Sequence, residues 1–166
     1  MKDTSDAARD FDFLIGDWTV SHRRLRRRLA GDTHWDMFDG TMRARSILAG
    51  QGNFDENVIR LPGGTYQACT LRIHDASAGH WSIHWIDGRD PKLDPPMIGG
   101  FADGTGTFFG KDSFEGRAID VRFLWTRRDG SAARWEQAFS ADGGKTWETN
   151  WIMDFHPARE REGTGV

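Results

Sequence analysis

The chain has 166 residues, with 22 Lys and Arg against 25 Asp and Glu, and a formal net charge of −3. This length suits one domain, and the acidic balance disfavours a nucleic-acid binder with an overall basic surface. The single cysteine, Cys69, excludes an internal disulfide and a zinc site built from several cysteines of one chain.

Apolar segments long enough for a membrane are missing, since no run approaches the ~18 residues of a spanning helix. Residues 1–12 carry four aspartates and no apolar signal region, so a cytoplasmic protein without a membrane partner is expected. Eight Trp and 11 Phe favour strands, and 20 Gly favour the tight turns between them. The composition therefore predicts an antiparallel β protein with many hairpins.

The chain begins with a short helical segment at 5–15, which ends at Gly16. A period of two then predicts a strand from Trp18 to Leu29, on which Trp18, Val20 and His22 share one face. Further strands are predicted at 35–48, 53–61, 65–75 and 80–87, separated by turns that contain glycine.

Three prolines, Pro91, Pro95 and Pro96, exclude residues 88–100 from a central strand, because proline cannot donate to a ladder. This segment is predicted to be a long loop over one end of the structure. The last strands are predicted at 117–127, 135–140 and 145–155, and a polar tail follows at 157–166.

The strands far outnumber the helices, and nothing between them could serve as a helical crossover for a parallel sheet. An open sheet of this size tends to curl, and closure removes its exposed edges. We therefore predict an all-β fold: a single antiparallel up-and-down barrel of about 8–10 strands with a short N-terminal helix, its core at about 10–155.

Two short motifs carry a resemblance to a known family. Gly16-x-Trp18 follows the N-terminal helical segment, and a Trp-rich hairpin runs from Trp135 to Trp151. On these features residues 10–155 resemble lipocalin and other calycin barrels, in particular bacterial calycin-like proteins of unassigned function. The resemblance implies a barrel with an internal cavity and names no ligand.

The segment from Ser140 to Trp147 matches the Asp-box pattern S-x-D-x-G-x-T-W, which sialidase-like propellers repeat. One copy argues against a propeller. Ser140 and Asp142 can bind the amides of a turn, and Trp147 can pack beneath it, so a structural hairpin is predicted.

The segment from His80 to Trp85 suggests a metal site, because His80 and His84 share a face of a strand. Four residues of a strand separate them by roughly 13 Å, too far for one ion, so no metal is expected. Haem-binding calycins of the nitrobindin type carry a glycine-rich extension after Gly-x-Trp. Here Thr19, Val20 and Ser21 occupy that place, so no cofactor is expected.

The only dense basic run comprises Arg23, Arg24, Arg26, Arg27 and Arg28. A solvated strand end is favoured over a nucleic-acid arm, because the net charge is negative and no aromatic residue interrupts the run. If His22 points inward, Arg24 also reaches the cavity, where it can bind a carboxylate or phosphate.

Polar side chains also gather between Asn53 and Asn57, after two glycines. A plain turn is favoured there, and a loop at the barrel mouth with ligand contacts is the alternative.

The last three strands have one aromatic and one mixed face. An even register pairs Leu124 with Glu136 and Glu136 with Asn150, which brings Arg122 diagonally near Glu136. The favoured interpretation places the aromatic face inside, and the alternative places a polar cluster of Arg122, Glu136 and Asn150 inside.

The favoured function is binding of a small hydrophobic or aromatic molecule, with or without an anionic group, in the cavity. The predicted ligand-binding residues are Trp18, His22, Arg24, Trp85, Arg122, Trp125, Trp135, Asn150 and Trp151. The alternative is a cofactor-independent enzyme, with Glu136 or Asp154 as general acid or base and Arg122 and Asn150 holding an oxyanion.

A third hypothesis, a protein-interaction module that uses exposed tryptophans, has the least support. The excess of aromatic side chains further suggests a second buried surface, and hence a homodimer. The expected partners are thus a small molecule and a second copy of the chain, with no nucleic acid.

Overall fold

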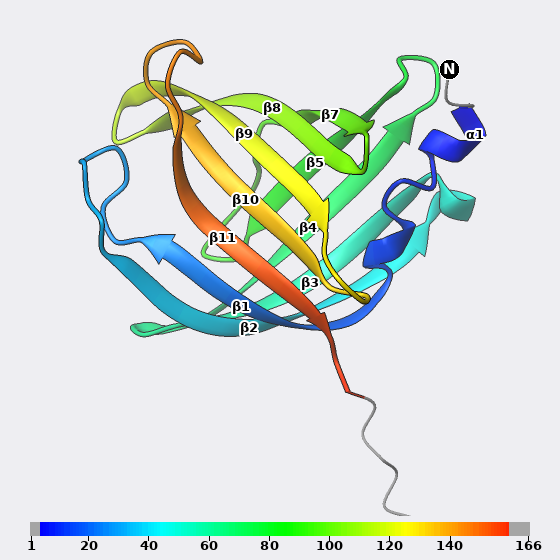
Figure 1. Ribbon diagram of the computed structural model, residues 1–166, viewed down its shortest axis with the longest axis horizontal. Coiled ribbons are helices and arrows are strands. Elements are labelled where there is room, and N and C mark those ends of the chain that lie inside the picture. Colours follow the sequence, from blue (N-terminus) through cyan, green and yellow to red (C-terminus); the bar gives the residue numbers. More distant parts are fainter. Residues whose placement is uncertain (1–3, 160–166) are drawn as a thin grey trace, which may run out of the picture.

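Strands hold about two thirds of the protein in a computed structural model that describes residues 4–159. A closed antiparallel barrel results (Figure 1), as the alternating pattern predicts. The strands are β1 (Gly16–Leu25), β2 (Trp35–Ile47), β3 (Gly52–Leu61), β4 (Gly64–Asp75), β5 (His80–Asp87), β6 (Asp90–Leu93), β7 (Met97–Ala102), β8 (Thr105–Phe114), β9 (Arg117–Arg127), β10 (Ala133–Ser140) and β11 (Glu148–Pro157).

Ten of these strands form the barrel wall in chain order, from β1 to β5 and from β7 to β11. Antiparallel pairing of β1 with β11 closes the barrel, with Val20 opposite Phe155. Within residues 4–159 the short strand β6 pairs with β5 alone, so it lies outside the ring as an edge strand. The up-and-down topology is confirmed, because each barrel strand pairs with its neighbours in the chain.

The predicted N-terminal helix is reduced to two single turns. The first is α1 (Thr4–Ala7), and the second is the 3₁₀ turn η1 (Asp12–Leu14). Another 3₁₀ turn, η2 (Leu48–Gly50), connects β2 to β3. Among the described residues, no helix has the length and apolar character needed to cross a membrane.

The N-terminal segment closes one end of the barrel, because Phe11 is buried among aromatic side chains of the wall. Its ring lies 5.0 Å from that of Trp81 on β5 and 4.9 Å from that of Phe101 on β7, centroid to centroid. The indole N–H of Trp81 donates to the carbonyl of Ala7 at 3.0 Å. We call this end the closed end.

Five connections lie together at the other end, which we call the mouth, because the strands alternate in direction: β1–β2, β3–β4, β5–β7, β8–β9 and β10–β11. The β1–β2 connection spans residues 26–34, since β1 ends at Leu25 and not at Leu29 as predicted. Of the predicted tail at 157–166, Pro157 still belongs to β11, and residues 160–166 lie outside the described residues.

The prediction of a long loop at 88–100 is wrong in part. Residues 90–93 form β6, and β7 begins at Met97. Pro91 lies on the edge strand β6, and Pro95 and Pro96 lie in the connection, where no ladder N–H is required. The prolines therefore limit where pairing occurs without preventing strands on both sides.

Candidate functional site

A cavity of about 110 Å³ lies inside the barrel. Its apolar wall consists of Met42, Ile83, Trp85, Pro95, Met97, Val121, Phe123, Trp125, Trp135, Phe139, Trp151, Met153 and Phe155. Its polar lining consists of Asp55, Asn57, Thr70, Arg72, Asp94, Lys111, Asp112 and Gln137. An apolar pocket with a few converging polar groups is typical of small-molecule sites.

A buried polar network occupies the wall formed by β3 and β4. Arg72 Nη1 donates to Asn53 Oδ1 at 2.9 Å and forms an ion pair with Asp55. Asn57 Nδ2 donates to the other oxygen of Asp55 at 2.6 Å. Asp55 is fully buried and Arg72 is 3% exposed, so the carboxylate and the guanidinium neutralise each other away from water.

Strand geometry explains this network. Asn53, Asp55 and Asn57 are two residues apart on β3, so their side chains share the inner face. The β3–β4 register places Asn53 opposite Arg72, which leaves Asp55 on the diagonal, within reach of a long guanidinium side chain.

Two buried N–H groups beside this network have no hydrogen-bond partner among the described residues. They are Arg72 Nε and Trp125 Nε1, and both residues line the cavity. The guanidinium carbon of Arg72 lies 5.4 Å from the ring centroid of Trp125. A buried donor without an acceptor is costly, so an oxygen acceptor bound here would stabilise both groups.

A second layer of contacts lies nearer the mouth, around His22 on β1. His22 stacks on Phe38 with the centroids 4.7 Å apart, and the indole N–H of Trp151 donates to His22 Nδ1 at 3.2 Å. Burial, then the charge of Arg24, lowers the pKa of His22 to about 4, while Asp39 opposes the shift. His22 is therefore neutral at pH 7, with its proton on Nε2, so that Nδ1 can accept.

Acidification should destabilise the protein between pH 6.5 and pH 4. In this interval the unfolded state binds a proton at His22 and the folded state does not, so the unfolding free energy decreases as the pH is lowered. The full loss of unfolding free energy is about 3 kcal/mol, which corresponds to the lowering of the His22 pKa from 6.5 to about 4. Urea denaturation at pH 7.0, 5.5 and 4.5 measures it, and His22→Gln should flatten the dependence. Equal slopes in both proteins would contradict this assignment.

The structure places four of the predicted tryptophans together. Trp85, Trp125, Trp135 and Trp151 all line the cavity, so the aromatic face points inward. Trp18 contributes to the core: its N–H donates to the carbonyl of Leu14 at 2.8 Å, and its ring packs edge-on against that of Phe155.

The alternative polar cluster does not form inside the barrel. Glu136 lies between the cavity-lining residues Trp135 and Gln137 and therefore faces outward; it pairs with Leu124 as predicted but with Ile152 in place of Asn150. The predicted register is two residues out at Glu136: the pairs near the turn, such as Ala138 with Thr149, are already one residue out, and the register shift between Gln137 and Ala138 adds the second. Asn150 is instead buried, and it accepts a hydrogen bond from Gln137.

Arg122 and Asp154 also lie on the outer face. Arg122 follows the cavity-lining Val121, and its guanidinium lies over the ring of Trp147, 4.8 Å from the centroid. Asp154 forms ion pairs with Arg134 at 2.6 Å and with Arg23 at 3.5 Å. These two side chains therefore do not join the cavity lining.

Sequence reasoning missed the network of Asp55 and Arg72. The strand predicted at 53–61 is confirmed as β3, whereas the plain turn favoured for the polar residues 53–57 is wrong, because these residues belong to the same strand. The available signal was the alternation itself, since Asn53, Asp55 and Asn57 share the parity of the apolar Ile59.

The Asp-box segment is a structured hairpin connection, as predicted. Asp142 Oδ1 accepts from the backbone N–H groups of Lys145 and Thr146, and Gly144 N donates to Ser140 Oγ. The indole N–H of Trp147 donates to the carbonyl of Gly144. These bonds satisfy the turn internally.

Within the described residues, no three His, Cys, Asp or Glu side chains cluster as metal ligands would. His80 and His84 alternate with Trp81, Ile83 and Trp85, whose side chains are buried or line the cavity, so both histidines face outward. Comparison with known protein families and with characterised proteins finds no match to this chain.

Proposed function

We propose that the protein binds a small amphipathic molecule in the barrel cavity. The observation that carries this proposal is a pair of donors, Arg72 Nε and Trp125 Nε1, that have no partner among the described residues and belong to a largely apolar cavity. The aromatic part of the ligand would pack among Trp85, Trp135 and Trp151. An oxygen acceptor, such as a carbonyl or hydroxyl, would take the two N–H groups.

The ligand oxygen that accepts from Arg72 and Trp125 should be uncharged. Asp55 already neutralises Arg72, so a second buried anion here would be desolvated without a free counter-charge. The alternative hypothesis, an enzyme, has less support. Its predicted acid and base, Glu136 and Asp154, are not among the residues that line the cavity.

A neutral aromatic amide tests the proposal, and 2-naphthamide provides both the ring system and the carbonyl. Isothermal titration calorimetry should show saturable binding to the wild-type protein. Val121→Phe adds bulk to the inner face of β9 and should weaken binding at least about tenfold by occupying the cavity.

Leu124→Phe is the matched control, since it makes a similar change on the outer face of the same strand. It should leave the affinity within about twofold. If 2-naphthamide does not bind, or binds equally to a folded Val121→Phe protein, the cavity is not its site and the proposal fails.

A further inference from the structure

The five arginines on β1 and in the loop that follows fall into two groups according to their contacts. Arg23 is paired with Asp154, Arg26 with Asp36 and Arg27 with Asp32. No such ion pair involves the remaining two, Arg24 and Arg28, within residues 4–159. The paired arginines are thus satisfied on the outer surface, whereas the other two contact aromatic rings.

Arg24 and Arg28 each lie over two rings at the mouth. The guanidinium carbon of Arg24 is 5.3 Å from the ring centroid of Trp151 and 5.5 Å from that of Phe38. That of Arg28 is 5.9 Å from the ring centroid of Phe139 and 4.8 Å from that of Phe114. Because Trp151 and Phe139 also line the cavity, the two cations stand at its rim.

The two cations influence each other. Burial, then the charge of Arg24, lowers the pKa of Arg28, and Glu115, Tyr66 and Glu148 partly offset the shift. Tyr66 is buried, and the charges of both arginines act on its phenol against the effect of burial. Two half-buried like charges near one hydroxyl group favour the binding of an oxyanion.

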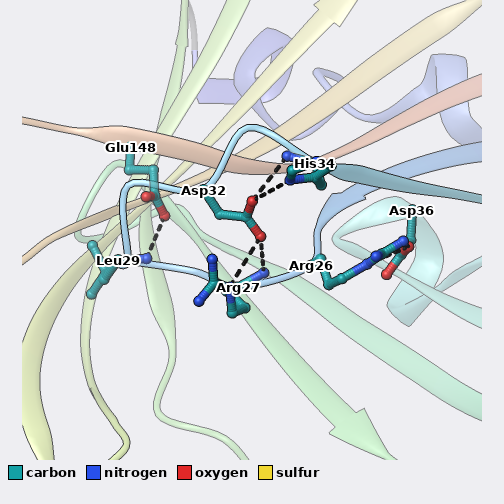
Figure 2. A network of polar contacts seen from close by, with 7 residues as sticks. All are labelled: Arg26, Arg27, Leu29, Asp32, His34, Asp36 and Glu148. Atoms are coloured by element: carbon teal, nitrogen blue, oxygen red, sulfur yellow. Dashed lines mark hydrogen bonds and ion pairs between the residues drawn. The ribbon is translucent and has the colours of Figure 1, made fainter.

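The loop that carries Arg28 is fixed in place (Figure 2). Asp32 accepts hydrogen bonds from the backbone N–H groups of Arg27 and His34, each at 3.1 Å. Glu148 of β11 accepts from the backbone N–H of Leu29 at 2.8 Å. Arg28 therefore lies between two anchored residues, and the guanidinium needs little ordering when it binds.

The acidic groups around the mouth limit where an anion can bind. Asp87 is near Arg24, but its carboxylate is held by Arg89 through two hydrogen bonds, at 3.0 and 2.7 Å. Asp94 and Asp112 line the cavity, and burial, then the charge of Asp112, raises the pKa of Asp94. Glu115 and Glu148 act on Arg28, but Glu148 already accepts a hydrogen bond from the backbone N–H of Leu29. The arginine pair is therefore the favourable place for an anionic group at the rim.

We propose that Arg24 and Arg28 bind the anionic group of the ligand, so that the protein selects amphipathic molecules with one planar oxyanion, best a carboxylate. This inference rests on the proposed function, because it assigns the charged end of the same ligand. A guanidinium can meet a carboxylate through two parallel hydrogen bonds, which a spherical cation cannot do.

Two matched ligands separate the contributions. 6-Hydroxy-2-naphthoate carries the anion at one end and, at the other, a hydroxyl oxygen for Arg72 Nε and Trp125 Nε1, and 6-hydroxy-2-naphthamide has nearly the same shape without charge. Wild-type protein should bind the naphthoate at least about tenfold more tightly at low salt, and the preference should shrink as salt screens the charges. Arg24→Gln and Arg28→Gln should each remove most of this preference and leave naphthamide affinity within about twofold.

Arg26→Gln is the control, because this neighbouring arginine is paired with Asp36 on the outer surface. It should keep the preference for the anion. Arg24→Lys retains the charge and should keep part of the preference, so it remains informative if Arg24→Gln unfolds. A second readout is the pKa of His22 by NMR, which naphthoate should raise by neutralising Arg24.

Each outcome has a distinct meaning. Equal affinity for both ligands, or a preference that survives in both glutamine variants, overturns the anion assignment and leaves the proposed function standing. No binding of either ligand to the wild-type protein removes the proposed function itself.

Discussion

Asp55→Ala is expected to lower the unfolding free energy by about 3–5 kcal/mol, because it leaves the charge of Arg72 buried and unpaired. Arg72 is 3% exposed, and its ion pair with Asp55 is supported by Asn53 and Asn57. Urea denaturation at pH 7 measures the change. A loss below about 1 kcal/mol would show that the pair is not needed to keep Arg72 inside.

The matched control is the double variant Asp55→Leu with Arg72→Met, which replaces both charges by apolar groups. Buried ion pairs are often exchanged in this way at little cost, so the double variant should be more stable than Asp55→Ala. If it folds but binds 2-naphthamide more weakly, Arg72 is retained for the ligand and not for stability.

The barrel could be predicted because its strands have a strict period of two. Trp18, Val20 and His22 are all buried on β1, and the predicted ends of β5, at His80 and Asp87, are those observed. Local turn chemistry was equally informative, since Ser140 and Asp142 make the hydrogen bonds that the Asp-box pattern implies.

The composition of the site depended on features that a single sequence does not show. The hairpin pairs Ala138 with Thr149, and the register shift after Gln137 then places Glu136 opposite Ile152, two residues from the predicted Asn150. The alternation of apolar and polar residues does not fix such a register. Asp55 looks like a turn residue until its partner is known, and that partner, Arg72, comes from the next strand.

The mouth shows the same division between local and non-local information. Arg24 could be placed on the face of His22 from the alternation of β1, and its guanidinium lies over the ring of the cavity-lining Trp151. Arg28 lies beyond the end of β1, and its position depends on the hydrogen bonds of Asp32 and Glu148 to the loop. The Asp32 contacts lie within the loop, and the Glu148 contact comes from β11 across the closed barrel, so strand periodicity shows neither.

Phe11→Ala should cost about 3–5 kcal/mol of unfolding free energy, the range for removing a buried phenylalanine. Phe11 is 1% exposed and has rings of Trp81, Phe101 and Trp125 within 6 Å of its own, centroid to centroid. It also lies 5.3 Å from the guanidinium carbon of Arg72. The substitution therefore removes the closed end's central packing and one of the two rings that cover the buried cation.

Phe109→Ala is the control for this change, because Phe109 is 51% exposed on the outer face of β8 and should cost less than about 0.5 kcal/mol. Urea denaturation of both variants at pH 7 gives the comparison. Similar losses in the two proteins would mean that the N-terminal segment adds little to the barrel. A large loss confined to Phe11→Ala would establish that Phe11 is a main contact by which the two short N-terminal turns, which would not be stable alone, pack onto the closed end of the barrel beside Arg72.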